Sequence, residues 1–171
     1  MNLDSAYDKY VVSCAIAVQA DIPFVAWGPP GVGKTAIMGA VAKALGRHHE
    51  VVIASIHEES DLGFPRPNYE RGCVEFMLPD FVMECILKRP SIMTLDEFST
   101  ARPSMQAACL RLIHERRVGT HSLDGVYVCA LANPAETTQG AYCLTAPMAN
   151  RFCHLFKHAD VVDTFERALL G

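Results

Sequence analysis

The sequence predicts an α/β fold of three layers, in which helices cover both faces of a parallel sheet of about five strands. Three observations lead to this prediction. Short apolar runs bounded by proline or glycine alternate with longer segments of helical periodicity. The first apolar run is followed by a glycine-rich loop and then at once by a helical segment. Two segments rich in turn-forming residues interrupt the alternation, and we expect them to be inserted β-hairpins.

The predicted elements follow one another at short intervals. Apolar residues recur at helical spacing over residues 6–19, which predicts a helix. The run 24–27 lies between Pro23 and Gly28 and is too short for a helix, so we expect a strand that is buried on both faces. The same reasoning predicts helices over residues 35–45, 80–88, 104–116 and 161–170, and strands over residues 51–56, 91–95, 127–132 and 152–156.

Two segments do not fit the alternation. Residues 63–77 place prolines and a glycine turn between aromatic and β-branched residues. Residues 118–126 carry a turn signal at Asp124-Gly125. We expect both segments to be hairpins, the second with a tip formed by residues 120–125.

The composition limits the number of domains and the class of partner. The chain has 171 residues, of which 50% are hydrophobic, and this suffices for one domain over residues 1–171. With 15 Lys and Arg against 19 Asp and Glu, it lacks the basic character of proteins that bind nucleic acid non-specifically.

Cellular location is predicted from the cysteines and the apolar runs. Seven cysteines without a Cys-x-x-Cys pair are typical of reduced thiols. No apolar run approaches the roughly 18 residues that span a bilayer, and the N-terminus lacks the basic start of a signal peptide. We therefore expect a cytoplasmic protein that does not bind membranes.

The glycine-rich loop matches the P-loop pattern G-x-x-x-x-G-K-[ST] in full. Its residues are Gly28, Pro29, Pro30, Gly31, Val32, Gly33, Lys34 and Thr35. Between a strand and a helix, the backbone N–H groups of such a loop surround the phosphates of a nucleotide, and the helix dipole faces the same anion. Lys34 is expected to reach the β- and γ-phosphate oxygens, and the Thr35 hydroxyl to coordinate Mg²⁺. The alternative is a glycine-rich turn that binds nothing.

Two carboxylates follow the predicted strand 91–95. Asp96 and Glu97 come directly after an apolar run, which places them at the C-terminal edge of the sheet, where open α/β folds bind ligands. This is the pattern of a Walker B motif. Asp96 would hold the Mg²⁺ shell, and Glu97 would polarise the attacking water as a general base. The alternative is an acidic surface turn.

Asn133 is a further candidate because of its position. It follows the predicted strand 127–132 and precedes Pro134, so it is expected at the same sheet edge. Its amide could orient a water or contact the γ-phosphate there. An Asn-Pro turn without a function is the alternative.

The order of these motifs resembles that of the MoxR-type AAA+ ATPases. The matching residues are the P-loop, Asp96-Glu97, Asn133-Pro134 and Asn150-Arg151-Phe152. The two predicted hairpins are similar to the insertions that this family carries in its second helix and before its sensor strand. Ser99-Thr100 depart from the Asn-Arg that many members carry after the Walker B segment. The resemblance covers residues 10–156.

The resemblance implies an ATPase core that requires Mg²⁺ and uses ATP to remodel a partner protein. It further implies a hexameric ring, often beside a protein with a von Willebrand A domain. Asn133 would be the sensor 1 residue, and Arg151 an arginine finger that reaches the γ-phosphate of the neighbouring subunit. Such modules continue into a helical lid, whereas this chain ends at Gly171. We therefore expect no lid within it, and ring assembly only if a lid is supplied.

Three alternatives remain open at this point. Nucleotide could switch the assembly of a module that has little turnover. Arg151 could form an intrachain salt bridge instead of serving a neighbour. The core could also belong to a DNA-linked motor, although the acidic composition and the absence of Lys and Arg from residues 120–125 argue against this.

Overall fold

The computed structural model describes residues 6–135, 140, 142 and 144–157. Its helices are α1 (Ala6–Gln19), α2 (Lys34–Ala44), α3 (Asp80–Leu87), α4 (Pro103–His114) and α5 (Ala146–Ala149). Its strands are β1 (Phe24–Trp27), β2 (His48–Ile53), β3 (Phe64–Asn68), β4 (Cys73–Met77), β5 (Ser91–Asp96), β6 (Arg117–Val118), β7 (His121–Ser122), β8 (Val126–Ala132) and β9 (Cys153–Phe156). Single turns of 3₁₀-helix lie at η1 (Ala54–Ile56), η2 (Glu59–Leu62) and η3 (Phe98–Thr100).

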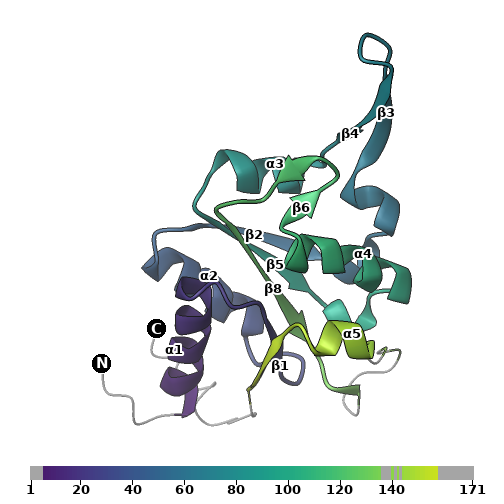
Figure 1. Ribbon diagram of the computed structural model, residues 1–171. Helices are drawn as coiled ribbons and strands as arrows, with labels where there is room; N and C mark the ends of the chain where they lie inside the picture. The colour runs from purple at the N-terminus through teal and green to yellow at the C-terminus, as the bar shows by residue number, and fades with distance from the viewer. Residues whose placement is uncertain (1–5, 136–139, 141, 143, 158–171) are drawn as a thin grey trace.

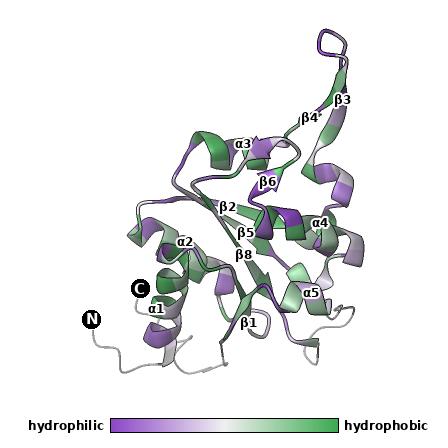
Figure 2. Ribbon diagram, in the orientation of Figure 1, coloured by the Kyte–Doolittle hydropathy of each residue, from purple (hydrophilic) through white to green (hydrophobic). Residues whose placement is uncertain are grey.

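A five-stranded sheet in the order β2-β5-β8-β1-β9 forms the middle layer (Figure 1). All its pairs are parallel, which confirms the predicted sheet. All seven residues of β8 are buried, and apolar residues predominate in the inner strands (Figure 2). Continuous apolar runs of this kind are what a strand covered on both faces requires.

Side-chain alternation along the strands builds two cores. Phe24 and Ala26 of β1 face the cluster formed with α1 and α2, whereas Val25 faces the cluster formed with α3 and α4. Consecutive strand residues point to opposite faces, so one short run supplies both layers. Each fully buried side chain of the size of Leu or Phe contributes roughly 1.5–3 kcal/mol.

The predicted boundaries differ from the structure at two elements. The strand expected over 51–56 is β2, which begins at His48 and gives way to η1 after Ile53. It pairs only with β5, at the sheet edge, where polar side chains such as those of His48 and Glu50 can reach solvent. The helix expected over 104–116 begins at Pro103 and ends at His114. Arg116 has a φ of 50°, which no right-handed helix accommodates.

Both predicted hairpins are present, but the second turns at a different place. Its strands are β6 and β7, so the chain reverses at Gly119-Thr120 and not at Asp124-Gly125. The prediction of a tip at residues 120–125 was therefore wrong. Leu123 is fully buried and its carbonyl accepts a bond from Val126 at 2.8 Å. Asp124-Gly125 form a second, inner turn that leads into β8.

The hairpin of β3 and β4 projects from the body of the molecule (Figure 1). Its base contacts the β6–β7 hairpin, since a Cβ added to Gly119 would lie 2.9 Å from the Cβ of Phe76. His121 is also 3.2 Å from the Phe76 carbonyl oxygen. The two insertions therefore pack on each other although about 45 residues separate them.

Within the described residues, the helices are all too short or too polar to cross a membrane. The helix predicted over 161–170 lies outside the described part of the chain.

Candidate nucleotide-binding site

Three neighbouring strands bring the predicted site residues to one edge of the sheet. β8 pairs in parallel with both β1 and β5, so the carboxyl ends of all three strands lie together. The P-loop follows β1, Asp96 ends β5, and Asn133 follows β8. Tertiary pairing thus joins residues from three separate parts of the sequence.

The P-loop adopts a conformation that depends on its glycines. Gly31 and Gly33 have φ values of 80° and 79°, in the left-handed region that disfavours other residues. A Cβ on Gly28 would lie 3.0 Å from the Lys157 carbonyl oxygen, so this position also needs a glycine. The Lys157 ammonium donates to the Val32 carbonyl at 2.5 Å, and α2 begins at Lys34. The loop is therefore held in a fixed curve in front of a helix N-terminus, where an anion is stabilised.

Lys34 lies at the centre of this edge and is almost fully buried, with 8% of its surface exposed. Its ammonium donates to the carbonyls of Gly28 at 2.8 Å and Pro29 at 3.1 Å, and to Oδ1 of Asn133 at 2.7 Å. Burial lowers the pKa of Lys34, Asp96 acts in the opposite direction, and Lys157 adds to the lowering. A phosphate entering the loop would give this buried cation a counter-ion.

Thr35 and Asp96 form a pair of oxygen ligands beside Lys34. The Thr35 hydroxyl donates to Oδ2 of Asp96 at 2.6 Å, and the other carboxylate oxygen accepts from the Glu97 backbone at 2.8 Å. Hydroxyl and carboxylate oxygens are the ligands that Mg²⁺ prefers, and Mg²⁺ usually takes only one or two of them beside phosphates and waters. The two side chains therefore fit the predicted metal site.

Glu97 is bonded through its carboxylate to Ser55. It has a φ of 53°, and its carboxylate accepts a hydrogen bond from the Ser55 hydroxyl, from η1. A left-handed φ in a residue other than glycine is uncommon and costs about 1–3 kcal/mol. Sequence reasoning missed Ser55 because it assigned this residue to a strand. A polar side chain directly after an edge strand was the available signal.

Asn133 is fixed on both sides. Its side chain accepts from Lys34, and its backbone N–H donates to the Ser99 hydroxyl at 3.1 Å. Ser99 follows the two carboxylates along the chain, in η3. It ties the end of β8 to the segment that follows β5, a contact that the sequence did not reveal.

Arg151 lies apart from these residues. It follows α5, is exposed, and donates through Nη1 to the Pro147 carbonyl at 2.7 Å. Among the described residues its guanidinium bonds this carbonyl and not a carboxylate. The structure therefore brings together Lys34, Thr35, Asp96 and Asn133, and leaves Arg151 directed elsewhere.

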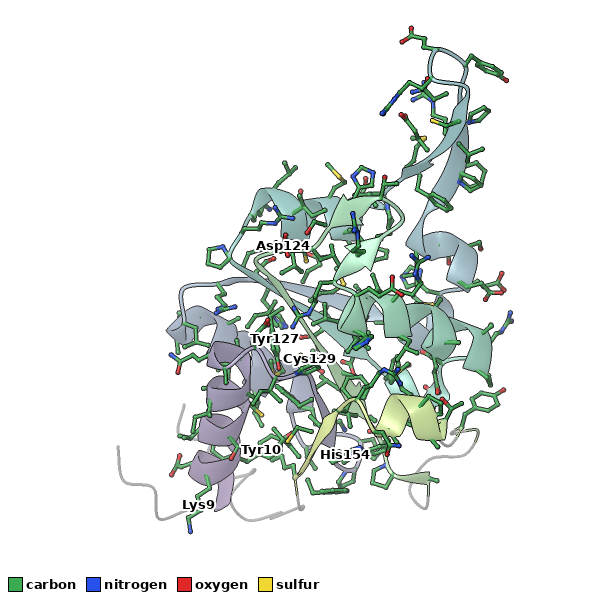
Figure 3. All side chains as sticks on the ribbon, in the orientation of Figure 1. Lys9, Tyr10, Asp124, Tyr127, Cys129 and His154 are labelled. Carbon is green, nitrogen blue, oxygen red and sulfur yellow. The ribbon has the colours of Figure 1, made fainter. Side chains whose placement is uncertain are left out.

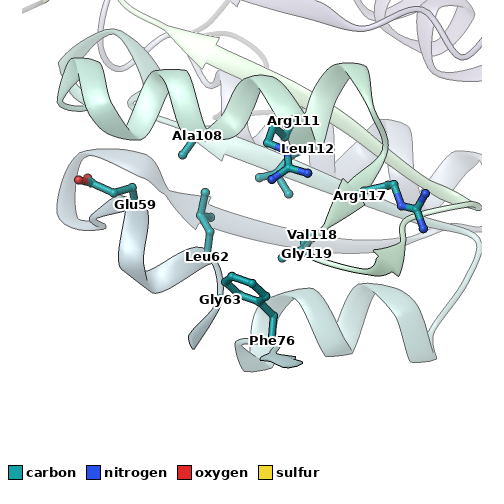
Figure 4. Close-up of a pocket in the computed structure, with 10 residues that line it drawn as sticks. All are labelled: Glu59, Leu62, Gly63, Phe76, Ala108, Arg111, Leu112, Arg117, Val118 and Gly119. Carbon is teal, nitrogen blue, oxygen red and sulfur yellow. The ribbon is translucent and has the colours of Figure 1, made fainter. Parts of the chain in front are cut away.

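A separate pocket of about 150 Å³ lies between α4, η2 and the bases of the two hairpins (Figure 4). Leu62, Phe76, Leu112 and Val118 give it an apolar lining. Its lining includes none of the P-loop residues or the two carboxylates, so it is distinct from the site at the sheet edge.

The parallel sheet, the P-loop and the convergent edge residues define a nucleotide-binding α/β domain with a P-loop AAA+ fold. The chain belongs to the AAA domain family, dynein-related subfamily, whose family model matches residues 23–157. It is therefore an ATPase domain.

Two curated relatives and one solved structure illustrate the similarity. Lon protease of Methylocella silvestris is 27% identical over 150 residues, 77% of this chain and 18% of that protein. Midasin of Giardia intestinalis is 27% identical over 160 residues, 86% of this chain and 3% of that protein. The structure of a proposed ATPase from Cytophaga hutchinsonii superposes with a TM-score of 0.64 at 20% identity, over 94% of this chain and 50% of that one. The chain thus spans half or less of the length of each of these relatives.

Proposed function

We propose that this domain hydrolyses ATP with Mg²⁺ held at Thr35 and Asp96, and with Glu97 as the general base. The observation that carries the proposal is the convergence of Lys34, Thr35, Asp96 and Asn133 at one sheet edge, through hydrogen bonds of 2.7 and 2.6 Å. Lys34 and Thr35 begin α2, Asp96 ends β5 and Asn133 follows β8. Buried lysine, hydroxyl, carboxylate and amide at a P-loop are the groups that phosphoryl transfer requires.

Each residue has a separate part in this mechanism. The P-loop N–H groups from Gly31 to Thr35 and the Lys34 ammonium bind the β- and γ-phosphates. Asn133 orients the attacking water. Glu97 takes a proton from that water while the water oxygen bonds to the γ-phosphorus and the bond to the bridging oxygen breaks, which yields ADP and phosphate. Mg²⁺ at Thr35 and Asp96 supplies positive charge beside the phosphate oxygens.

The hydrogen bond from Ser55 turns the Glu97 carboxylate toward η1, which opposes its action on a water at the γ-phosphate. Hydrolysis then requires Glu97 to leave Ser55.

Assembly and client remodelling form the second part of the proposal. Arg151 is exposed and does not contact the site of its own subunit, which suits a residue that acts at the nucleotide of a neighbour. The projecting hairpin exposes large apolar side chains, of which Tyr69 is 90% and Phe64 68% exposed. Exposed apolar surface of this kind suits contact with another protein. We propose a MoxR-like homo-oligomer, hexameric when a lid is supplied, that remodels a protein client in the cytoplasm, with a von Willebrand A domain protein as a candidate partner.

Phosphate release and nucleotide binding by the full chain and by Glu97→Gln test the catalytic part. The variant should bind ATP as the native chain does and lose about 100-fold or more of its turnover, since a general base contributes about 10²–10⁴-fold. Chelation of Mg²⁺ should abolish turnover of the native chain. Equal turnover of the two proteins would exclude Glu97 as the base. If the native chain changed its oligomeric size with ATP but released no phosphate, the assembly module would be the better description.

A further inference from the structure

The single tryptophan of the chain, Trp27, is bonded to His154. Trp27 is the last residue of β1 and directly precedes the P-loop. Its indole N–H donates to Nδ1 of His154 at 2.9 Å, and the two rings are stacked with centroids 6.0 Å apart and 10° between their planes. Figure 3 labels His154 beside α5 and β9. β1, which leads into the P-loop, is thereby joined to β9 by a side-chain hydrogen bond as well as by backbone pairing.

The other ring nitrogen of His154 reaches α5. Nε2 lies 2.9 Å from the carbonyl oxygen of Ala149, the last residue of α5. Because Nδ1 accepts from the indole, the neutral ring carries its proton on Nε2 and donates it to this carbonyl. One imidazole therefore bridges the residue before the P-loop and the end of α5.

Arg151 is fixed to the same end of α5. Its backbone N–H donates to the Met148 carbonyl at 3.1 Å, and its guanidinium donates to the Pro147 carbonyl at 2.7 Å. The position of α5 thus sets the position of Arg151. His154 is a hydrogen-bonding side chain that joins this short helix to β1, beside the apolar packing of Met148.

We infer that His154 is a positioning residue, which couples the P-loop of its own subunit to Arg151 and so to the nucleotide of the neighbouring subunit. The inference rests on the proposed action of Arg151 at a neighbour. The route begins at Lys34, whose ammonium bonds the Gly28 and Pro29 carbonyls. Phosphate competes with these carbonyls for the Lys34 ammonium, and release of the Gly28 carbonyl shifts the adjoining Trp27. The indole N–H then moves His154, and with it the last carbonyl of α5.

Ring stacking alone could give a purely structural role to the same residues. Phe156 is stacked 6.3 Å from Trp27 and 6.5 Å from His154, so an aromatic ring at position 154 keeps the packing. His154→Phe removes both hydrogen bonds and retains the stack. His154→Gln offers an acceptor to Trp27 and a donor to Ala149, and should restore the link. Trp27→Phe removes only the indole N–H.

Mixed full-length proteins separate an effect on the neighbour from an effect within the subunit. Arg151→Ala protein keeps a complete site but supplies no arginine, whereas Glu97→Gln protein supplies Arg151 but lacks the base. Mixing the two should restore phosphate release. The active sites are then those of the Arg151→Ala protein, and the Glu97→Gln protein supplies Arg151 to them. His154→Phe is then placed either in the protein that supplies Arg151 or in the protein that hosts the active site.

We expect His154→Phe in the supplying protein to lower kcat of the mixture by about tenfold with KM for ATP unchanged, since a small misplacement of a catalytic group costs up to about 100-fold. Trp27→Phe there should give the same loss, and His154→Gln should recover most of it. In the hosting protein, His154→Phe should change kcat by less than about twofold. Equal urea unfolding midpoints for the variants establish that the fold is retained.

Equal losses in the two placements, or no loss in either, would overturn the inference while leaving the role of Arg151 intact. A mixture that stays inactive with native His154 would contradict the assignment of Arg151 itself, and the coupling would fall with it. Native activity with Phe and loss with Gln at position 154 would assign His154 a role in packing only.

Discussion

The side chains of Lys34 and Asn133, which lie 99 residues apart in the sequence, are joined by a hydrogen bond of 2.7 Å. The bond connects the P-loop to the end of β8. It holds the amide oxygen beside the P-loop lysine and supplies one of three acceptors for the buried ammonium. We therefore expect the Lys34–Asn133 pair to affect both ATP binding and ATP hydrolysis. Substitutions of Asn133 should separate the two effects.

Asn133→Ala should lower ATP turnover by about 100- to 1,000-fold, since the loss of one group that stabilises the transition state costs in this range. ATP affinity should change little, because Lys34 and the loop N–H groups remain. Asn133→Asp is the matched control. Its added negative charge would pair with Lys34 and repel phosphate, so it should weaken ATP binding by about tenfold, or roughly 1.4 kcal/mol. Titration with a fluorescent ATP analogue, together with phosphate release, distinguishes the two. Equal affinities of the two variants would contradict the placement of Asn133 at the phosphates.

Ser55→Ala should raise basal ATP turnover by about two- to tenfold, because it frees the Glu97 carboxylate from a hydrogen bond of the charge-assisted kind. Ser55→Thr, which keeps a hydroxyl, should retain the native rate. Both variants should bind ATP with native affinity. Steady-state phosphate release measures the effect. A lower rate in Ser55→Ala would mean that Ser55 holds Glu97 in its active orientation.

Gly119→Ala should destabilise the fold more than Gly72→Ala. Both glycines have left-handed φ values, of 54° and 61°, so each substitution costs about 1–2 kcal/mol in backbone strain. Only at Gly119 does the new Cβ meet another residue, 2.9 Å from the Cβ of Phe76, and overpacking adds about 1–3 kcal/mol. Urea unfolding should show this difference. In a Phe76→Gly background, which lacks that Cβ, the two substitutions should cost the same. Equal costs in the native background would rule out the packing of the two hairpins.

The cysteines should divide into two reactivity classes. Cys73 and Cys153 are exposed, whereas Cys14, Cys85, Cys109 and Cys129 are buried. Burial raises the pKa of Cys85 to about 11 and of Cys129 to about 12, so these thiols stay protonated at pH 9 and the reactive thiolate is scarce.

Labelling with a thiol reagent checks this division. In a Cys143→Ser variant, two of the remaining six thiols should react under native conditions, and all six after unfolding. Raising the pH from 7 to 9 should not bring a third thiol into reaction, because the buried thiols stay protonated. Rapid native labelling of Cys129 would place β8 outside the core.

Residues next to one another in the sequence made part of the site predictable. The P-loop, and the Asp96-Glu97 pair after an apolar strand, are local patterns, because a strand–loop–helix unit suffices to form each one. The turn of the second hairpin was misplaced because Asp124-Gly125 has the stronger local turn signal. Leu123 before that pair is buried, so Asp124-Gly125 form the turn into β8, and Gly119 lies in the hairpin turn.

The sequence by itself determined the α/β class, the parallel sheet and the residues of the nucleotide site, since strand periodicity and the spacing of the P-loop are local properties of the chain. Only the tertiary structure decided which of these residues meet. The pairing of β8 with both β1 and β5 brings Asn133 to Lys34 and Asp96 to Thr35. Ser55 at Glu97, and His154 between Trp27 and α5, likewise depend on strand order. These contacts join segments from different strands, and no local pattern specifies the distance between them.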